Sequence, residues 1–176
     1  MCIYTTVSHP KHFYYCMHRV NLIHSTPDGD NLVSYMARVS NPSNQNNTET
    51  SARLIKYLIK HKHWSPFEMV NMCVEIHTTR SIAAQILRHR SFSFQEFSQR
   101  YAAVAEKPDT LVVRRQDTTN RQSSIDDVDP YTSQDFQIKA QQVYDLSYGL
   151  YNEMLAAGIA KECAREVLPL SSPTPL

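Results

Sequence analysis

The sequence contains only three glycines among its 176 residues. Glycine-rich phosphate loops and the GxGxxG dinucleotide fingerprint both need several glycines close together in one turn. Gly29, Gly149 and Gly158 are too far apart to form either motif. If the chain binds a nucleotide cofactor, side chains and helix ends must hold it.

Cysteine is also scarce, and the four residues are scattered without a CxxC pair: Cys2, Cys16, Cys73 and Cys163. Neither a disulfide framework nor a zinc site is indicated, and we expect reduced thiols. No apolar run approaches the length of a membrane span, and the first residues lack the apolar stretch of a signal peptide. We therefore predict a cytoplasmic protein, or one in the host cytoplasm if the source is a virus, with no membrane partner.

The charge is nearly balanced, with a formal net charge of +1 and a pI near 7.7. Such a chain has no global field that would attract nucleic acid, so any anion site must be local. Hydrophobic residues make up 41% and charged residues 20%, which is ordinary for a globular protein. The length is that of one domain with a sizeable core.

The most unusual segment runs from Arg88 to Tyr101. It mixes arginines, a histidine, a glutamate, serines and glutamines with Phe92, Phe94 and Phe97. Phenylalanines have no use on a solvated surface, whereas arginines cannot be buried without partners. The mixture fits a partly buried cleft that grips an anion and stacks a flat ring. A wet, charge-paired surface turn is the alternative, and composition alone does not separate the two.

The order of the motifs points to a known family. Arg88-His89-Arg90 followed after seven residues by Ser98 resembles the signature of the flavin-dependent thymidylate synthases. The resemblance runs from about Asn21 to Pro173. Other positions and blocks also match the family, in its order: Ala37–Ser40, His63–Glu68, Gln85, Glu96, Arg100 and Ala164–Pro169.

The resemblance implies a reaction. In this family reduced FAD, recharged by NADPH, passes a hydride to the pyrimidine of dUMP, and methylenetetrahydrofolate donates the one-carbon unit to give dTMP. No cysteine nucleophile is used, and none lies in the signature segment here. The family does not hold FAD in a Rossmann fold, in agreement with the scarcity of glycine. Its members are homotetramers with shared active sites, which implies the same assembly here.

The resemblance also implies two sets of site residues. The cofactor set is Ser65, Arg88, His89, Arg90 and Glu96. The substrate set is Gln85, Arg88, Glu96, Phe97, Ser98, Gln99, Arg100 and Arg165. Arginine forks such as those of Arg100 and Arg165 suit a 5′-phosphate, and a glutamine can meet a uracil edge or a ribose. Ser98 has no base near it in sequence, so we favour it as a ligand over a nucleophile.

The chain departs from the family after its Leu168-Pro169-Leu170 block. The family continues with further flavin contacts and with an arginine that polarises the pyrimidine, whereas this chain ends at Leu176. We therefore expect a C-terminally incomplete chain and assign no catalytic residue. One alternative is an inactive remnant that still binds FAD or nucleotide in part. Another is a nucleic-acid-binding module, because arginines and aromatic residues alternate.

The predicted fold class is α+β, with an antiparallel or mixed sheet flanked by helices. Residues 17–176 form a single domain, and residues 1–16 are an extension before a start at Met17. Residues 17–24 and 70–76 are predicted strands, the second with Met72, Val74 and Ile76 facing inward. His61 and His63 have no third ligand nearby, so we predict no metal site.

The sequence also predicts three helix features. Asp30 is a plausible N-cap of a helix that ends at Ser40. A helix over 79–90 would place Gln85 and Arg88 on one face. A long helix over 133–157, ended by Gly158, would bury a face that includes Phe136, Val143, Tyr144, Leu150 and Tyr151.

Overall fold

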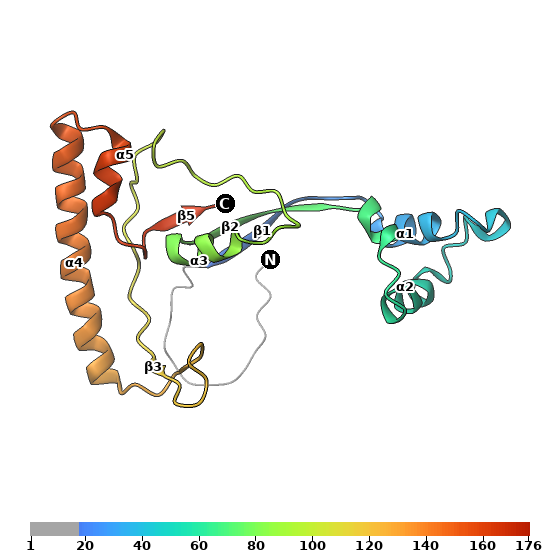
Figure 1. Ribbon diagram of the computed structural model, residues 1–176, viewed down its shortest axis with the longest axis horizontal. Helices are drawn as coiled ribbons and strands as arrows, with labels where there is room; N and C mark the ends of the chain where they lie inside the picture. The colour runs from blue at the N-terminus through green and yellow to red at the C-terminus, as the bar shows by residue number, and fades with distance from the viewer. Residues whose placement is uncertain (1–17) are drawn as a thin grey trace. The chain divides into compact units, whose positions relative to one another are not determined.

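The computed structural model describes residues 18–176, so the predicted extension at 1–16 and the start at Met17 lie outside the described residues. The described chain forms two compact units, one of Val20–Ile76 and one of His77–Leu176 with His18 and Arg19. Figure 1 labels the α-helices and the strands β1, β2, β3 and β5. Within residues 18–176, no helix is both long and apolar enough to cross a membrane.

The unit of Val20–Ile76 contains most of β1 (Arg19–Ser25) and the first part of β2 (Met72–Thr79). These strands lie side by side: Asn21 donates to the Glu75 carboxylate at 2.9 Å, and the Thr26 amide donates to the Asn71 carbonyl at 2.9 Å. The unit also contains two α-helices and two short 3₁₀ helices: α1 (Gly29–Ala37), η1 (Pro42–Asn44), α2 (Ser51–Lys60) and η2 (Ser65–Met69). Helix α1 packs against α2 and η2.

Two predictions for this unit are wrong in detail. The N-cap of α1 is Asp28, not Asp30, and its left-handed φ of 52° is set by the turn that enters the helix. The predicted inward face of β2 is not buried at its start, where Met72 is 73% exposed. Pairing of β2 with β5 begins only at His77, so burial increases along the strand toward Thr78.

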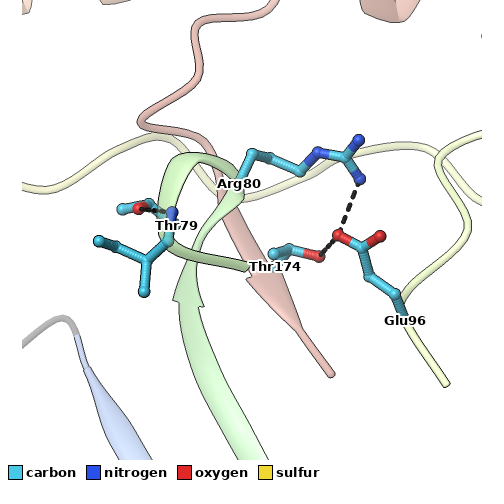
Figure 2. Close-up of polar contacts among 5 residues, drawn as sticks. Thr79, Arg80, Glu96 and Thr174 are labelled. Carbon is cyan, nitrogen blue, oxygen red and sulfur yellow. Dashed lines mark hydrogen bonds and ion pairs between the residues drawn. The ribbon is translucent and has the colours of Figure 1, made fainter. Parts of the chain in front are cut away.

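In the second unit, the end of β2 pairs antiparallel with β5 (Pro173–Pro175), with Thr78 opposite Thr174. The sheet order is β1-β2-β5. Helix α3 (Arg80–Ile86) follows β2 directly and packs on β5. Its N-cap is Thr79, whose hydroxyl accepts the Ile82 amide proton at 3.4 Å (Figure 2). A short antiparallel pair, β3 (Arg115–Gln116) and β4 (Ser124–Ile125), completes the strands of the described residues.

Helix α4 (Pro130–Ala156) is long, and α5 (Lys161–Ala164) and η3 (Arg165–Val167) pack against it (Figure 1). Asp129 caps its start by accepting the Thr132 amide proton at 2.9 Å. Gly158, with φ of 78°, follows its end as predicted. The α+β fold class with antiparallel strands is thus confirmed.

The buried face of α4 agrees with the predicted one only in part. The predicted Tyr144 and Tyr151 are buried together with Tyr148, whereas the predicted core residues Phe136, Val143 and Leu150 are exposed. The phenol groups explain the choice, because they meet backbone polar atoms that burial would leave unpaired. The Tyr151 hydroxyl accepts the Val104 amide proton at 3.0 Å, and the Tyr148 hydroxyl donates to the Glu106 carbonyl at 2.7 Å.

Candidate functional site

The signature segment begins where α3 ends. Helix α3 stops at Ile86, so the predicted helix over 79–90 is too long and Arg88 does not share a helical face with Gln85. The physical reason is a tightened last turn, in which the Arg88 amide bonds the Gln85 carbonyl at 3.3 Å and the His89 amide bonds the Ile86 carbonyl at 3.0 Å. Gln85, Arg88, His89 and Arg90 are all exposed to solvent.

The ring of His89 lies flat on the ring of Phe92, with centroids 3.9 Å apart and planes 9° from parallel. The Ser91 amide lies 3.4 Å from Nδ1 of the same imidazole and donates to it. Phe94 contacts Phe92 edge-on at 6.2 Å. These contacts hold the imidazole in one orientation on an otherwise exposed turn.

Glu96 is the most connected residue of the segment. Arg80 Nη1 donates to Glu96 Oε1 at 3.0 Å, and the Thr174 hydroxyl reaches the same oxygen at 3.4 Å (Figure 2). The next amide, that of Phe97, donates to the Pro175 carbonyl at 3.0 Å. The Glu96 side chain is 22% exposed, so this carboxylate is only partly shielded from water.

After Glu96, the side chains of Phe97 and Gln99 lie toward the interior. Phe97 packs against the core cluster of Val104, Tyr148, Tyr151 and Ala164. Gln99 is 5% exposed, and its Nε2 has no hydrogen-bond partner in the described residues. Ser98 is exposed, so its hydroxyl can reach a ligand from solvent. The segment is thus a surface turn at Arg88–Phe92 and a partly buried strip at Glu96–Gln99.

Arg100 and Arg165 both lie next to α5. Arg100 Nε lies 3.1 Å from Glu162 Oε2 on α5, and Arg165 follows one helical turn later in η3. The Arg165 guanidinium is half-buried and lies 3.7 Å from the Glu166 carboxylate. The predicted phosphate contacts therefore both border α5, and each has a carboxylate beside it.

Ser65 belongs to the other compact unit, where it opens η2. The rings of Tyr57, His61 and His63 lie together just before it, with the tyrosine and His61 centroids 4.2 Å apart. In the described part of the chain, no group of three or more His, Cys, Asp or Glu residues could hold a metal ion.

A cavity of about 480 Å³ lies beside this strip, among β2, β5 and residues 103–109. Phe97 and Thr174 line it, and Arg19 donates to the His77 ring at 3.0 Å along the same wall. Of the predicted site residues, all of which the structure describes, Phe97 alone lies on its wall. Nearby, burial raises the pKa of the Tyr148 phenol above its ordinary value; Tyr151 and Glu106 add to the effect, and the hydrogen bond to Ser172 opposes it.

The sequence did not predict the two residues that donate hydrogen bonds to the Glu96 carboxylate, Arg80 and Thr174. Arg80 directly follows the β2 strand as the first residue of α3, a position where the helix dipole does not favour a cation. Its link to Glu96 is a contact across 16 residues that no local pattern announces. Thr174 lies in the C-terminal segment, past the last family block that the sequence shows.

A family model described as thymidylate synthase complementing protein matches residues 21–176. A probable flavin-dependent thymidylate synthase from Paramecium bursaria Chlorella virus 1 is 54% identical over 145 residues, covering 82% of this chain and 67% of that protein. The flavin-dependent thymidylate synthase of Synechocystis is 52% identical over 151 residues, covering 86% of this chain and 68% of that protein. The relative from Dictyostelium discoideum is 36% identical over 145 residues, covering 81% of this chain and 48% of that protein.

A solved structure has a fold similar to that of this chain. The UMP/dUMP methylase PolB from Streptomyces cacaoi, bound with 5-Br dUMP, matches with a TM-score of 0.77 and 29% sequence identity. The match covers 90% of this chain and 70% of that chain.

Proposed function

The chain belongs to the flavin-dependent thymidylate synthase family, and on this premise we propose that it serves the reductive methylation of dUMP to dTMP with FAD as its cofactor. NADPH is the proposed reductant and methylenetetrahydrofolate the proposed one-carbon donor. The observation that carries the proposal is the family match over residues 21–176, which includes the whole signature segment.

The residues proposed for FAD have chemistry that fits it. Arg88 and Arg90 are exposed guanidinium groups with no described ion pair, and such forks suit the pyrophosphate of a dinucleotide. His89 offers an imidazole whose orientation Phe92 holds, and Glu96 offers a carboxylate held by Arg80. Ser65 is proposed as a further contact. When bound, the flavin would supply the hydride.

The residues proposed for dUMP divide by chemistry. Arg100 and Arg165 would hold the 5′-phosphate, which would displace the carboxylates now beside them. Ser98 adds a hydroxyl donor as a ligand. Gln99 has a buried amide nitrogen without a partner among the described residues, which supports a role in donating to a bound group. The remaining proposed contacts are Gln85, Arg88, Glu96 and Phe97.

The chain's own contribution is therefore binding and orientation. No catalytic residue is assigned among these side chains. Fixed cations and hydrogen-bond donors would align the pyrimidine with the cofactor and reduce the entropy lost on reaching the reactive geometry. A homotetramer with shared sites and a cytoplasmic location complete the proposal, and size measurement by light scattering tests the assembly.

The direct test is a visible absorption spectrum of the purified protein, recorded before and after FAD is added and then during a dUMP titration. We expect a protein-bound flavin band that shifts with dUMP. A colourless protein that ignores both ligands would contradict the proposal. Growth of a thymidine-requiring strain that expresses the chain then tests turnover, with an Arg100→Gln variant as the negative control.

A further inference from the structure

We propose that Arg80 is a positioning residue that holds the Glu96 carboxylate in the orientation met by the bound cofactor or nucleotide. The inference rests on the proposed function, in which Glu96 contacts both. Arg80 lies outside every sequence block that carries the family resemblance.

The described contacts engage one oxygen of the Glu96 carboxylate, Oε1, and leave the other, Oε2, available to a ligand. Arg80 at 3.0 Å and the Thr174 hydroxyl at 3.4 Å both lie against Oε1 (Figure 2). Within residues 18–176, no hydrogen bond to Oε2 is described. An ionised carboxylate can accept about four hydrogen bonds. Oε2 can therefore accept an N–H or O–H of a ligand while Oε1 stays engaged.

The backbone places these side chains independently of the ion pair. The Arg80 amide donates to the Ser172 carbonyl at 3.0 Å, and the Phe97 amide donates to the Pro175 carbonyl at 3.0 Å. Thr174 lies between these two acceptors and pairs with Thr78. Arg80 and Phe97, the residue after Glu96, are thus tied by main-chain bonds to the segment that contains Thr174. The Arg80–Glu96 ion pair is therefore not needed to hold the backbone around Glu96. Its effect is to orient the Glu96 side chain.

A glutamate loses rotamer freedom when a ligand orders it, and a partner that orders it beforehand removes that loss from binding. The expected gain in affinity from ordering one such side chain is about three- to tenfold. Partial exposure of the pair limits its effect on folding, because solvent screens it. The predicted signature is therefore weaker ligand binding with nearly unchanged stability.

The experiment measures FAD and dUMP affinities by flavin absorbance for the full chain and its variants. Arg80→Gln is expected to weaken binding of at least one ligand about three- to tenfold, and Arg80→Lys to recover part of the loss. In a Glu96→Gln background the Arg80→Gln effect should disappear, since the residue acts through Glu96. Arg115→Gln is the matched control. It removes an arginine from an exposed ion pair, with Asp127 at 2.9 Å, and should leave both affinities unchanged.

The outcomes separate the two proposals. A wild-type chain that binds neither ligand overturns the proposed function and this inference with it. Wild-type binding that Arg80→Gln leaves unchanged, or a loss that persists in the Glu96→Gln background, overturns the inference alone. Thermal unfolding confirms that each variant folds. If Arg80→Gln does not fold, the same cycle uses Arg80→Lys, which keeps the charge but lacks the planar fork.

Discussion

The two halves of the signature segment differ in how the protein holds them. Arg88, His89 and Arg90 lie on an exposed turn, where the main side-chain contact is the stack of His89 on Phe92. Glu96, Phe97 and Gln99 are instead tied to Arg80, to β5 and to the core. Both halves are proposed ligand contacts, yet only the second is built into the fold.

The difference indicates that the two halves of the signature segment would contribute to ligand binding in different ways. Groups fixed before binding lose little freedom when a ligand arrives, whereas exposed arginines must be ordered by the ligand itself. We therefore expect substitutions in the anchored half to affect folding and binding together. Substitutions in the exposed half should affect binding alone. The following predictions test this contrast, from the largest expected effect to the smallest.

The largest effect should come from Phe97→Ala compared with Phe92→Ala. Phe97 packs on the core cluster, so its loss should lower the free energy of unfolding by about 2–4 kcal/mol. Phe92 is 61% exposed, and its loss should change that free energy by about 0.5 kcal/mol or less. Urea unfolding followed by circular dichroism measures both. Equal losses for the two variants would remove the structural basis of the comparison.

Arg88→Gln should separate binding from folding. It removes one guanidinium that is proposed to meet the cofactor, and the expected loss of FAD affinity is about tenfold. Because the side chain is exposed, the free energy of unfolding should change by about 0.5 kcal/mol or less. Flavin titration and urea unfolding on the same sample give both numbers. A stability loss as large as that of Phe97→Ala would contradict the exposed placement.

Tyr148→Phe tests the anchor beneath the second half. Loss of the hydrogen bond to the Glu106 carbonyl should cost about 1 kcal/mol at neutral pH. The raised pKa of Tyr148 also predicts a pH effect. An unfolded tyrosine ionises near pH 10, and the folded one ionises at higher pH, so wild-type stability should fall as pH rises above that value. The variant should show a shallower alkaline decline, whereas equal slopes would exclude Tyr148 as the cause.

Gln99→Met should raise the stability of the protein and lower its affinity for dUMP. Replacing a buried amide whose nitrogen has no partner among the described residues should raise the free energy of unfolding by about 1 kcal/mol. If the amide serves dUMP, affinity for dUMP should fall in the same variant. Calorimetry with and without dUMP reads both effects. A destabilised variant with unchanged dUMP affinity would show that the amide is a structural group.

Glu162→Gln is expected to have the smallest effect. Its carboxylate pairs with Arg100 at 3.1 Å and so competes with an anionic ligand. Neutralising it should tighten dUMP binding about two- to threefold with little change in stability, because exposed pairs contribute little. Lys139→Gln, in the exposed pair with Asp135, is the control. Weaker dUMP binding in Glu162→Gln would mean that the pair orients Arg100 rather than blocking it.

Sequence patterns predicted those elements whose signals are local. The alternation in β2 and the stop at Gly158 are carried by neighbouring residues. The strand occupies Met72–Thr79 and so overlaps the predicted 70–76, and Gly158 follows α4 as predicted. The predicted buried face of α4 was right at Tyr144 and Tyr151 but wrong at Phe136, Val143 and Leu150, which are exposed. The helix instead buries tyrosines, and the hydroxyls of Tyr148 and Tyr151 pair with the backbone of residues 104–106. That preference depends on a segment far away in the chain.

The site shows the same limit. Motif spacing singled out Glu96 and Arg100, but nothing near them in sequence names their partners, Arg80 and Glu162. The length of α3 was also misjudged, because residues 87–90 have helical composition and the turn that ends the helix depends on tightened backbone bonds. Candidate site residues can therefore be proposed from motif spacing, whereas their ion-pair partners are found only in the tertiary structure.

The proline content of β5 has a consequence for solubility. Two of its three residues, Pro173 and Pro175, have no N–H to offer to another strand, and the Pro175 carbonyl already accepts the Phe97 amide proton. Unpaired sheet edges act as templates for intermolecular strand addition and aggregation. Here the bond from Phe97 to Pro175, which places Glu96 beside the sheet, also occupies a backbone acceptor of β5. Together with the two prolines, it leaves the β5 edge few backbone groups that could pair with a strand of another molecule.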